Sequence, residues 1–206
     1  MTVTRSDAGD LIEKEDIAAL LGELEAAFGD LPVPPDDQIV YDNSGDHLEC
    51  NQIRAKLRGR HWRDLSSDDL AGEADSLGFL TPEAFRFFLP ASITVSLIDP
   101  ERADLIPNVI LWSLAKPALS EFWSRRGESI LEGAEAHGIP KGLLSELAAA
   151  ATAGGHHGDE ARERRLEMLS TEQKRAVRNF ISFLRRHRSG EFPYGELDRV
   201  EEALTS

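Results

Sequence analysis

The chain has 206 residues, of which 41% are hydrophobic and 29% are charged. This composition is typical of a globular protein with one sizeable core, and it excludes a disordered chain. Its single cysteine, Cys50, excludes an intrachain disulfide and a zinc module built on several cysteines. The N-terminus carries Asp7 and Asp10 and shows neither a signal-peptide nor a transit-peptide pattern, so we expect a cytoplasmic protein.

The net charge of −14 is distributed unevenly along the chain. Residues 1–50 hold thirteen acidic residues against Arg5 and Lys14, a net charge of −11. Residues 174–188 contain no acidic residue and six basic ones, Lys174, Arg175, Arg178, Arg185, Arg186 and Arg188. Such asymmetry indicates either a partner of matching charge or two parts of one fold that face each other.

The first predicted helix runs from near Asp10 or Asp16 to Phe28, because apolar side chains recur there at helical spacing. Those side chains are Ile17, Leu20, Leu21, Leu24 and Phe28. A long loop with three prolines follows, and its length makes it a candidate binding loop. Within the loop, residues 38–41 are the one candidate for a short strand.

Two cap signals predict the next helices. Asp46 and Glu49 have the spacing of a capping box, and Gly59 is placed to end the helix that they begin. Cys50, Ile53 and Leu57 form the inner face of that helix. Ser66 and Asp69 predict a further short helix that ends near Ala74.

Residues 77–100 are the most apolar part of the chain and predict its central helix. Thr81 is a natural N-cap, Pro82 suits the first helical position, and Glu83 complements the helix dipole. Apolar residues then occur around the whole circumference, as expected of a helix that is buried on most sides. Pro90 is expected to kink or divide this helix. Polar interruptions argue against a membrane span.

The rest of the chain is also predicted to be helical. Residues 115–168 are interpreted as a peripheral helical insertion, with a flexible joint at about 153–160. Ser170 and Gln173 form a capping box that begins the last long helix, and a short terminal helix follows. We therefore predict an all-α fold: a single domain over residues 1–206, an irregular helical bundle around a buried central helix at about 82–98.

Three segments of this chain resemble an uncharacterised bacterial family, a domain of unknown function. The segments are HLECNQIRAKLRGRHWRDL, LGFLTPEAFRFFLPA and LSTEQKRAVRNFISFL, and they cover about half of the chain. The family pattern is C-x-E-C, then G-x-x-W, a PEAFRFYLP-like core and a terminal helix. This chain carries only the second cysteine of the first motif, Cys50. The resemblance implies a small helical bacterial protein and brings no established activity, cofactor or catalytic residue.

Candidate metal and catalytic residues are few. His47 and Cys50 are weak metal candidates, since zinc needs three or four converging ligands and the neighbouring Asp46 and Glu49 are explained by a helix cap. Motifs of hydrolases, zinc proteases, dinucleotide-binding proteins and P-loop proteins are absent from the sequence. An enzyme is therefore the less favoured interpretation, and no cofactor is predicted.

Arg86 and Trp62 are the two residues with an ambiguous role. A guanidinium on a largely buried helix requires a partner, so Arg86 either forms a structural ion pair or reaches outward, or it binds an anion in a cleft. Trp62 is either a core anchor or a platform on which a ligand stacks. The functional interpretation of both predicts a small-ligand or metal pocket near them.

The leading functional hypothesis is a non-enzymatic, cytoplasmic, bacterial protein-binding module that uses its acidic N-terminal surface. A basic protein partner fits this charge, as it does for inhibitors of toxic nucleases, which is an analogy only. Binding of a polyanion such as nucleic acid through residues 174–188 is disfavoured by the net charge of −14, and no membrane association is expected.

The charge asymmetry also predicts a contact within the fold. The acidic N-terminal region and the basic helix should lie close together, with Glu23, Glu25, Asp36 or Asp37 facing Arg175, Arg178 or Arg185. Contacts of this kind are exposed, so each should contribute only about 0–1 kcal/mol.

Overall fold

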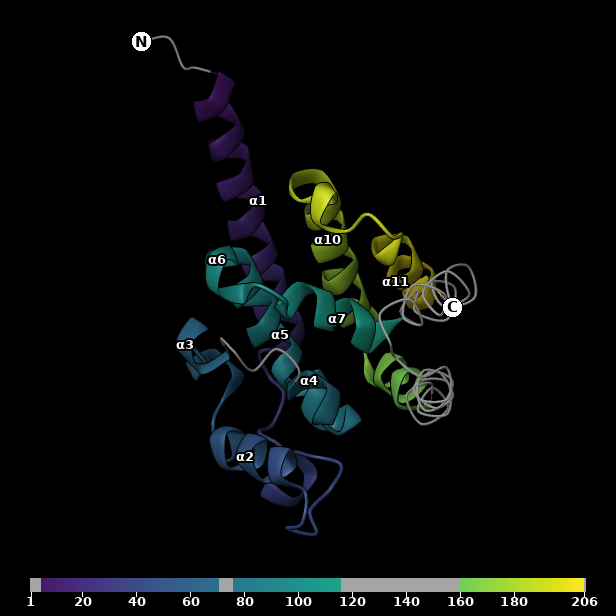
Figure 1. The fold of residues 1–206 in the computed structure, drawn as a ribbon. Coiled ribbons are helices and arrows are strands. Elements are labelled where there is room, and N and C mark those ends of the chain that lie inside the picture. The colour runs from purple at the N-terminus through teal and green to yellow at the C-terminus, as the bar shows by residue number, and fades with distance from the viewer. Residues whose placement is uncertain (1–4, 71–75, 116–159, 206) are drawn as a thin grey trace, which may run out of the picture.

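A computed structural model describes residues 5–70, 76–115 and 160–205, and it confirms the all-α fold class (Figure 1). The α-helices with described bounds are α1 (Arg5–Phe28), α2 (Leu48–Leu57), α3 (Ser67–Leu70), α4 (Ser76–Phe79), α5 (Pro82–Ile98), α6 (Pro100–Ala103), α7 (Ile106–Leu114), α10 (Thr171–His187) and α11 (Glu196–Thr205). Three short 3₁₀ helices join them, η1 (Asp36–Gln38), η2 (Trp62–Asp64) and η3 (Ser189–Glu191). Residues 160–168 are also helical.

Helix α5 is the buried centre of the bundle, as predicted. The hydroxyl of Thr81 accepts a hydrogen bond from the backbone N–H of Ala84 at 3.1 Å, and Pro82 is at the start of the helix. Twelve of its seventeen residues are buried. Pro90 lies inside the helix and does not divide it. Over the described ranges, no helix is long and apolar enough to cross a membrane.

Five helices close a ring around the core. Helix α5 contacts α1 and α7, α10 contacts α1 and α11, and α11 contacts α7 (Figure 1). Each member places large buried side chains inside the ring, among them Phe28, Phe85, Ile110, Phe180 and Leu204. Burial of one such side chain contributes about 1.5–3 kcal/mol, so this shared core is the main source of stability.

Three features of the N-terminal part differ from the prediction. Helix α1 begins at Arg5, earlier than expected. The cap of α2 is His47, not Asp46: its backbone is extended, and its Nδ1 accepts a hydrogen bond from the N–H of Cys50 at 3.4 Å. Residues 38–41 contribute one isolated antiparallel bridge, between Val40 and Leu80, because residues 36–38 already turn into η1.

Other predicted helix boundaries are confirmed. Gly59 follows α2 with φ +67°, a left-handed conformation that glycine adopts without steric cost. Ser66 and Asp69 cap α3 reciprocally. Ser170 and Gln173 form the capping box of α10. Residues 71–75, which complete the helix predicted to Ala74, lie outside the described residues.

Most of the predicted insertion, 115–168, also lies outside the described residues, as does the predicted joint at 153–160 except for Glu160. Only Ala115 and residues 160–168 of this segment are described, so the peripheral position of the whole segment stays a prediction. Glu160 is helical, and Arg165 is buried against α4, α5 and α7. Residues 160–168 therefore pack on the core.

Asp69 provides a first test of the local structure. Its carboxylate accepts hydrogen bonds from Arg60 at 2.7 and 3.0 Å and from the N–H of Ser66 at 2.8 Å. These bonds, those of Arg60 foremost, hold the pKa of Asp69 well below its ordinary value of 3.8. We expect Asp69→Asn to lower the free energy of unfolding by about 1 kcal/mol at neutral pH, because a cap and an ion pair are weakened.

The pH dependence follows from the sign of this shift. The folded-state pKa lies below the unfolded value, so the stabilisation is complete above pH 3.8 and is lost as the pH falls toward the folded-state pKa. Urea unfolding of both proteins at a series of pH values measures it. The difference between wild type and Asp69→Asn should shrink in acid; a constant difference would contradict the assignment.

Candidate functional site

Trp62 lies in the core. It is 6% exposed, and the guanidinium of Arg63 lies 4.9 Å from the centroid of its ring. Its indole N–H is buried and has no hydrogen-bond partner among the described residues. This placement agrees with the interpretation of Trp62 as a core anchor and leaves no open ring face on which a ligand could stack.

Among the described residues, the side chain of Arg86 binds a neutral amide and no carboxylate. Its Nε donates to Oε1 of Gln173 at 2.7 Å. Gln173 is 1% exposed, and it also donates to the carbonyl of Ala27 at 3.0 Å and accepts from the N–H of Ser170 at 3.1 Å. This amide therefore joins the end of α1, the second turn of α5 and the start of α10. The sequence identifies Gln173 only as a helix cap.

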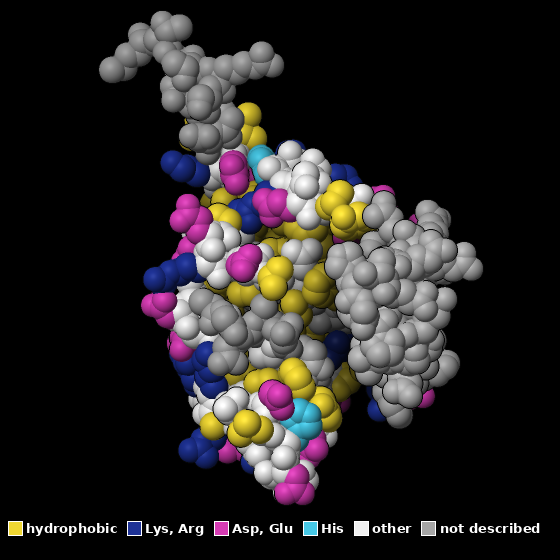
Figure 2. Space-filling model, in the orientation of Figure 1, with side chains coloured by type: hydrophobic (Ala, Val, Ile, Leu, Met, Phe, Trp, Pro, Cys, Tyr) yellow, Lys and Arg dark blue, Asp and Glu magenta, His cyan; other side chains and the backbone are white. Residues whose placement is uncertain are grey.

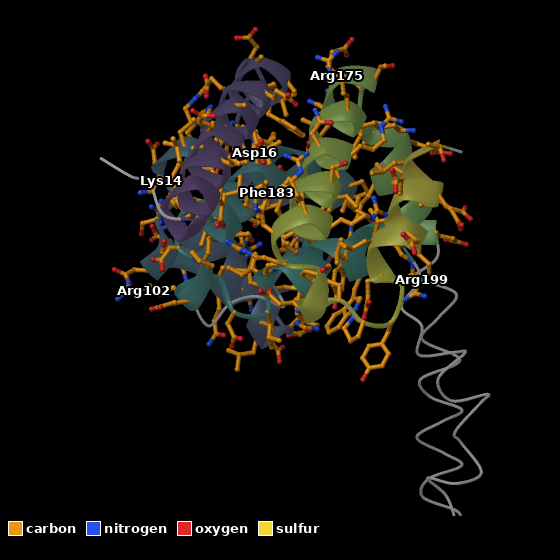
Figure 3. All side chains as sticks on the ribbon, turned by 90° about the horizontal axis from the view of Figure 1, so that it is seen from above. Lys14, Asp16, Arg102, Arg175, Phe183 and Arg199 are labelled. Carbon is orange, nitrogen blue, oxygen red and sulfur yellow. The ribbon has the colours of Figure 1, made fainter. Side chains whose placement is uncertain are left out.

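The acidic N-terminal region does contact the basic helix, as predicted, but the charged contact is made by Asp16 and not by one of the acidic residues named in the prediction. Helices α1 and α10 pack together, and Asp16 on α1 faces α10 (Figure 3). Its carboxylate binds Arg186 and, at 2.8 Å, Nε2 of His187. Hydrogen bonds from His187 and then from Arg186 lower the pKa of Asp16. Glu23, one of the predicted residues, accepts a hydrogen bond from the neutral Asn179.

The other named pairings are wrong. Glu25 pairs with Arg63 in η2. Arg185 pairs with Asp198 at 2.8 Å and Glu201 at 2.7 Å, both on α11. Successive helical residues point about 100° apart, so neighbouring arginines of α10 reach different helices. Asp36 and Asp37 line a small cavity of about 300 Å³ beside α2, together with Asn51, Arg54, Ala55 and Arg58.

The weak metal candidates, His47 and Cys50, are both engaged within the fold. Cys50 is fully buried in the core, and Nδ1 of His47 is engaged as the cap of α2. Over the described ranges, no group of three or more His, Cys, Asp or Glu side chains could hold a metal ion.

An exposed aromatic cluster lies where the long loop meets α2 and α4. The ring of Tyr41 stacks on that of Phe79, with 5.9 Å between the centroids and 14° between the planes. The ring of His47 lies edge-on to both, at 5.7 and 5.6 Å. Tyr41 is 58% exposed and the neighbouring Leu48 is 66% exposed. The cluster therefore presents apolar groups to solvent on a rigid support.

Acidic residues surround this cluster. Asp42, Asp46 and Glu49 lie beside it in the chain, and Figure 2 shows apolar, acidic and histidine side chains gathered at the end of the molecule where α2 lies. We call Tyr41, Asp42, Asp46, His47, Leu48, Glu49 and Phe79 the acidic aromatic surface. The sequence analysis missed Phe79 and Leu48, although Leu48 is out of phase with the inner face of α2.

A larger cavity, of about 890 Å³, lies between α4, the start of α5, α7 and residues 160–165. Its lining includes Tyr41, Glu83, Trp112, Arg162, Arg164 and Arg165. We call it the Arg165 cavity. Its volume is within the usual range of small-molecule sites, about 300–1,000 Å³. Neither Trp62 nor Arg86 lines it, so the pocket predicted beside them is not here.

Arg165 is the least expected residue of this region. It is 5% exposed, and its Nη2 donates to the carbonyls of Leu77, Gly78 and Leu80 at 3.1–3.3 Å. Its Nη1 reaches the carbonyl of Ser113 at 3.5 Å, and the guanidinium lies 4.8 Å from the ring centroid of Phe85. Burial, and next the charge of Arg162, lower the pKa of Arg165 to about 10, so it remains charged at neutral pH.

The carbonyls of Leu77 and Gly78 belong to α4, that of Leu80 directly follows α4, and that of Ser113 belongs to the last turn of α7. Carbonyls at the C-terminal end of a helix have no partner within that helix. A cation is favourable at such an end because of the helix dipole. Arg165 therefore caps two helices at once. The sequence of residues 159–165, which is mostly charged, does not indicate that Arg165 is buried and its neighbour Arg164 exposed.

We compared the chain with models of protein families, with curated proteins and with solved structures, and none of the three comparisons found a match. The resemblance to an uncharacterised bacterial family therefore stays a prediction.

Proposed function

We propose that this protein is a non-enzymatic, cytoplasmic, bacterial protein that binds a basic partner protein through the acidic aromatic surface. The observation that supports the proposal most is the exposure of Tyr41 and Leu48 among carboxylates. Exposed aromatic groups that are held rigidly lose little conformational entropy on binding, and tyrosine is frequent among residues that dominate binding energy.

The support beneath Tyr41 restricts its motion. Its hydroxyl lies 3.1 Å from Nε2 of His47, and its ring stacks on Phe79. Desolvation, and next the nearby thiol of Cys50, raise the pKa of Tyr41 above 10.0. The hydroxyl end is therefore held against the protein while much of the ring remains exposed to a partner.

The carboxylates of this surface differ from two others of the N-terminal region. Asp16 and Glu25 are bound by arginines of the same chain. Within the described residues, no Lys or Arg pairs with Asp42, Asp46 or Glu49, although Glu49 lies 3.2 Å from Nδ1 of His47. Hydrogen bonds from Ser44 lower the pKa of Asp42, which is therefore ionised at neutral pH. The negative charge of this surface remains available to attract a basic partner.

The alternative functions have less support. A ligand or metal pocket at Trp62 and Arg86 conflicts with the burial of Trp62 and the bond from Arg86 to Gln173. Polyanion binding by residues 174–188 is disfavoured because Arg185 and Arg186 are engaged by Asp198, Glu201 and Asp16.

Partner capture with matched variants tests the proposal. Tagged wild-type protein and Asp42→Asn/Asp46→Asn are incubated with lysate of the source cell at several salt concentrations, and retained proteins are quantified by mass spectrometry. We expect the wild type to retain a basic protein whose binding weakens with salt. The double variant should bind that protein about tenfold more slowly, because steering by charge is reduced.

Glu101→Gln/Glu167→Gln is the control, since both residues are exposed and the change in net charge is the same. Leu48→Ser tests the apolar part without a change of charge. Equal loss of the partner in the control, or unchanged binding by both Leu48→Ser and the aspartate variant, would show that this surface is not the binding site.

A further inference from the structure

We infer that the Arg165 cavity binds a small organic anion whose apolar part lies against Trp112. This site is separate from the partner binding proposed above, although Tyr41 borders both. The cavity volume of about 890 Å³ accommodates a small metabolite-sized molecule.

The charges of the lining favour an anion. Arg162, Arg164 and Arg165 line the cavity, against Glu83 and Glu160. The described lining thus brings three basic and two acidic side chains together in a chain whose net charge is −14. Arg165 is held by backbone carbonyls, and no carboxylate binds it among the described residues. Backbone dipoles stabilise this charge without cancelling it, so Arg165 contributes positive potential to the cavity.

The start of α5 adds to this preference. Thr81, Pro82 and Glu83 line the cavity, and they are the N-cap and the first two residues of the seventeen-residue α5. The N-terminus of a helix carries partial positive charge. In α5 this charge acts through the dipole, because Pro82 has no N–H and the N–H of Ala84 is bound by the hydroxyl of Thr81. Glu83 is exposed, so its carboxylate is not confined to the cavity.

Apolar side chains of the lining supply a surface for the rest of the ligand. Trp112 is 42% exposed although it belongs to the otherwise largely buried helix α7. Leu80, Pro82 and Val109 also line the cavity. A few polar groups set in an apolar wall are typical of small-molecule sites. Arg164 is exposed and borders the cavity, which makes it the arginine best placed to contact the anionic group.

Calorimetric titration with three related probes tests the inference on the full chain. Phenylacetate and phenyl phosphate carry an anionic group on an aromatic ring, and phenylacetamide has the shape of phenylacetate without its charge. At least one anion should bind about tenfold more tightly than the amide, because hydrogen bonds to charged groups are the stronger ones. Comparison of the two anions identifies the preferred headgroup.

Variants locate the site. Arg164→Gln and Trp112→Ala should each weaken binding of the preferred anion about tenfold, whereas Arg102→Gln should not, since Arg102 on α6 does not line the cavity. Melting curves show whether each variant is folded, and the exposed Arg164 carries the test if Trp112→Ala unfolds. Asp42→Asn/Asp46→Asn should retain anion binding, which separates this site from the partner surface. Absence of binding by both anions, equal affinity for the amide, or unchanged affinity of Arg164→Gln would overturn the inference.

Discussion

Replacement of Arg165 by methionine should destabilise the protein by about 3–5 kcal/mol. Methionine retains much of the apolar length of the side chain but removes every donor. The carbonyls of Leu77, Gly78, Leu80 and Ser113 then lose the guanidinium that binds them. Each buried polar group left without a partner costs about 1–3 kcal/mol, and the ends of α4 and α7 lose a favourable cation as well. Urea unfolding at neutral pH measures the change.

Two further variants make this prediction specific. Arg164→Met removes the same charge from the adjacent exposed position and should change the free energy of unfolding by less than about 0.5 kcal/mol. Arg165→Lys keeps the charge but not the planar fork of donors, so its stability should lie between wild type and Arg165→Met. Similar stabilities for Arg164→Met and Arg165→Met would show that Arg165 does not cap these helices.

Gln173→Met should destabilise the protein by about 2–4 kcal/mol. The buried amide of Gln173 binds Arg86, Ala27 and Ser170, and methionine of similar size replaces none of these bonds. The half-buried guanidinium of Arg86 and the carbonyl of Ala27 both lose a partner, and the capping box of α10 is broken. The loss is measured by urea unfolding, with the exposed Thr171→Ala as the control.

A double-mutant cycle separates the interaction from simple loss of packing. Arg86→Met removes one hydrogen-bond partner of Gln173, and Gln173→Met removes the side-chain partner of Arg86. In the double variant both polar side chains are absent, so neither is left unpaired. The double variant should therefore lose less stability than the sum of the single variants, by about 0.5–3 kcal/mol. Additive losses would mean that the hydrogen bond between the two side chains contributes nothing.

Much of the helical framework follows from local sequence. The hydroxyls of Thr81, Ser66 and Ser170 cap helices within four residues of themselves, and Gly59 adopts the conformation that ends α2. The central position of α5 follows from apolar residues on all its sides. Such features depend on neighbours in the chain, so the residue types and their spacing are sufficient to predict them.

The sequence around α2 offers two side chains that can accept a hydrogen bond at its N-cap, and residue preference alone selects the wrong one. Asp46 and His47 both precede the helix, and aspartate is the commoner cap. The structure places His47 there because its ring is also held by Tyr41 and Phe79, which come from the loop and from α4. A contact outside the helix thus determined which residue caps it.

The sequence by itself determined the all-α class, the caps of α3, α5 and α10, and the apolar side of α10. Only the tertiary structure decided where the charges are neutralised. Arg165 binds carbonyls more than eighty residues earlier in the chain, and Arg86 meets Gln173 across a similar separation. Arg185 and Arg186 are adjacent in sequence and bind different helices. A side-chain type states which bonds a residue is able to form, but its partner is set by the packing of helices that are distant in sequence, because hydrogen bonds and ion pairs act over a few ångströms only.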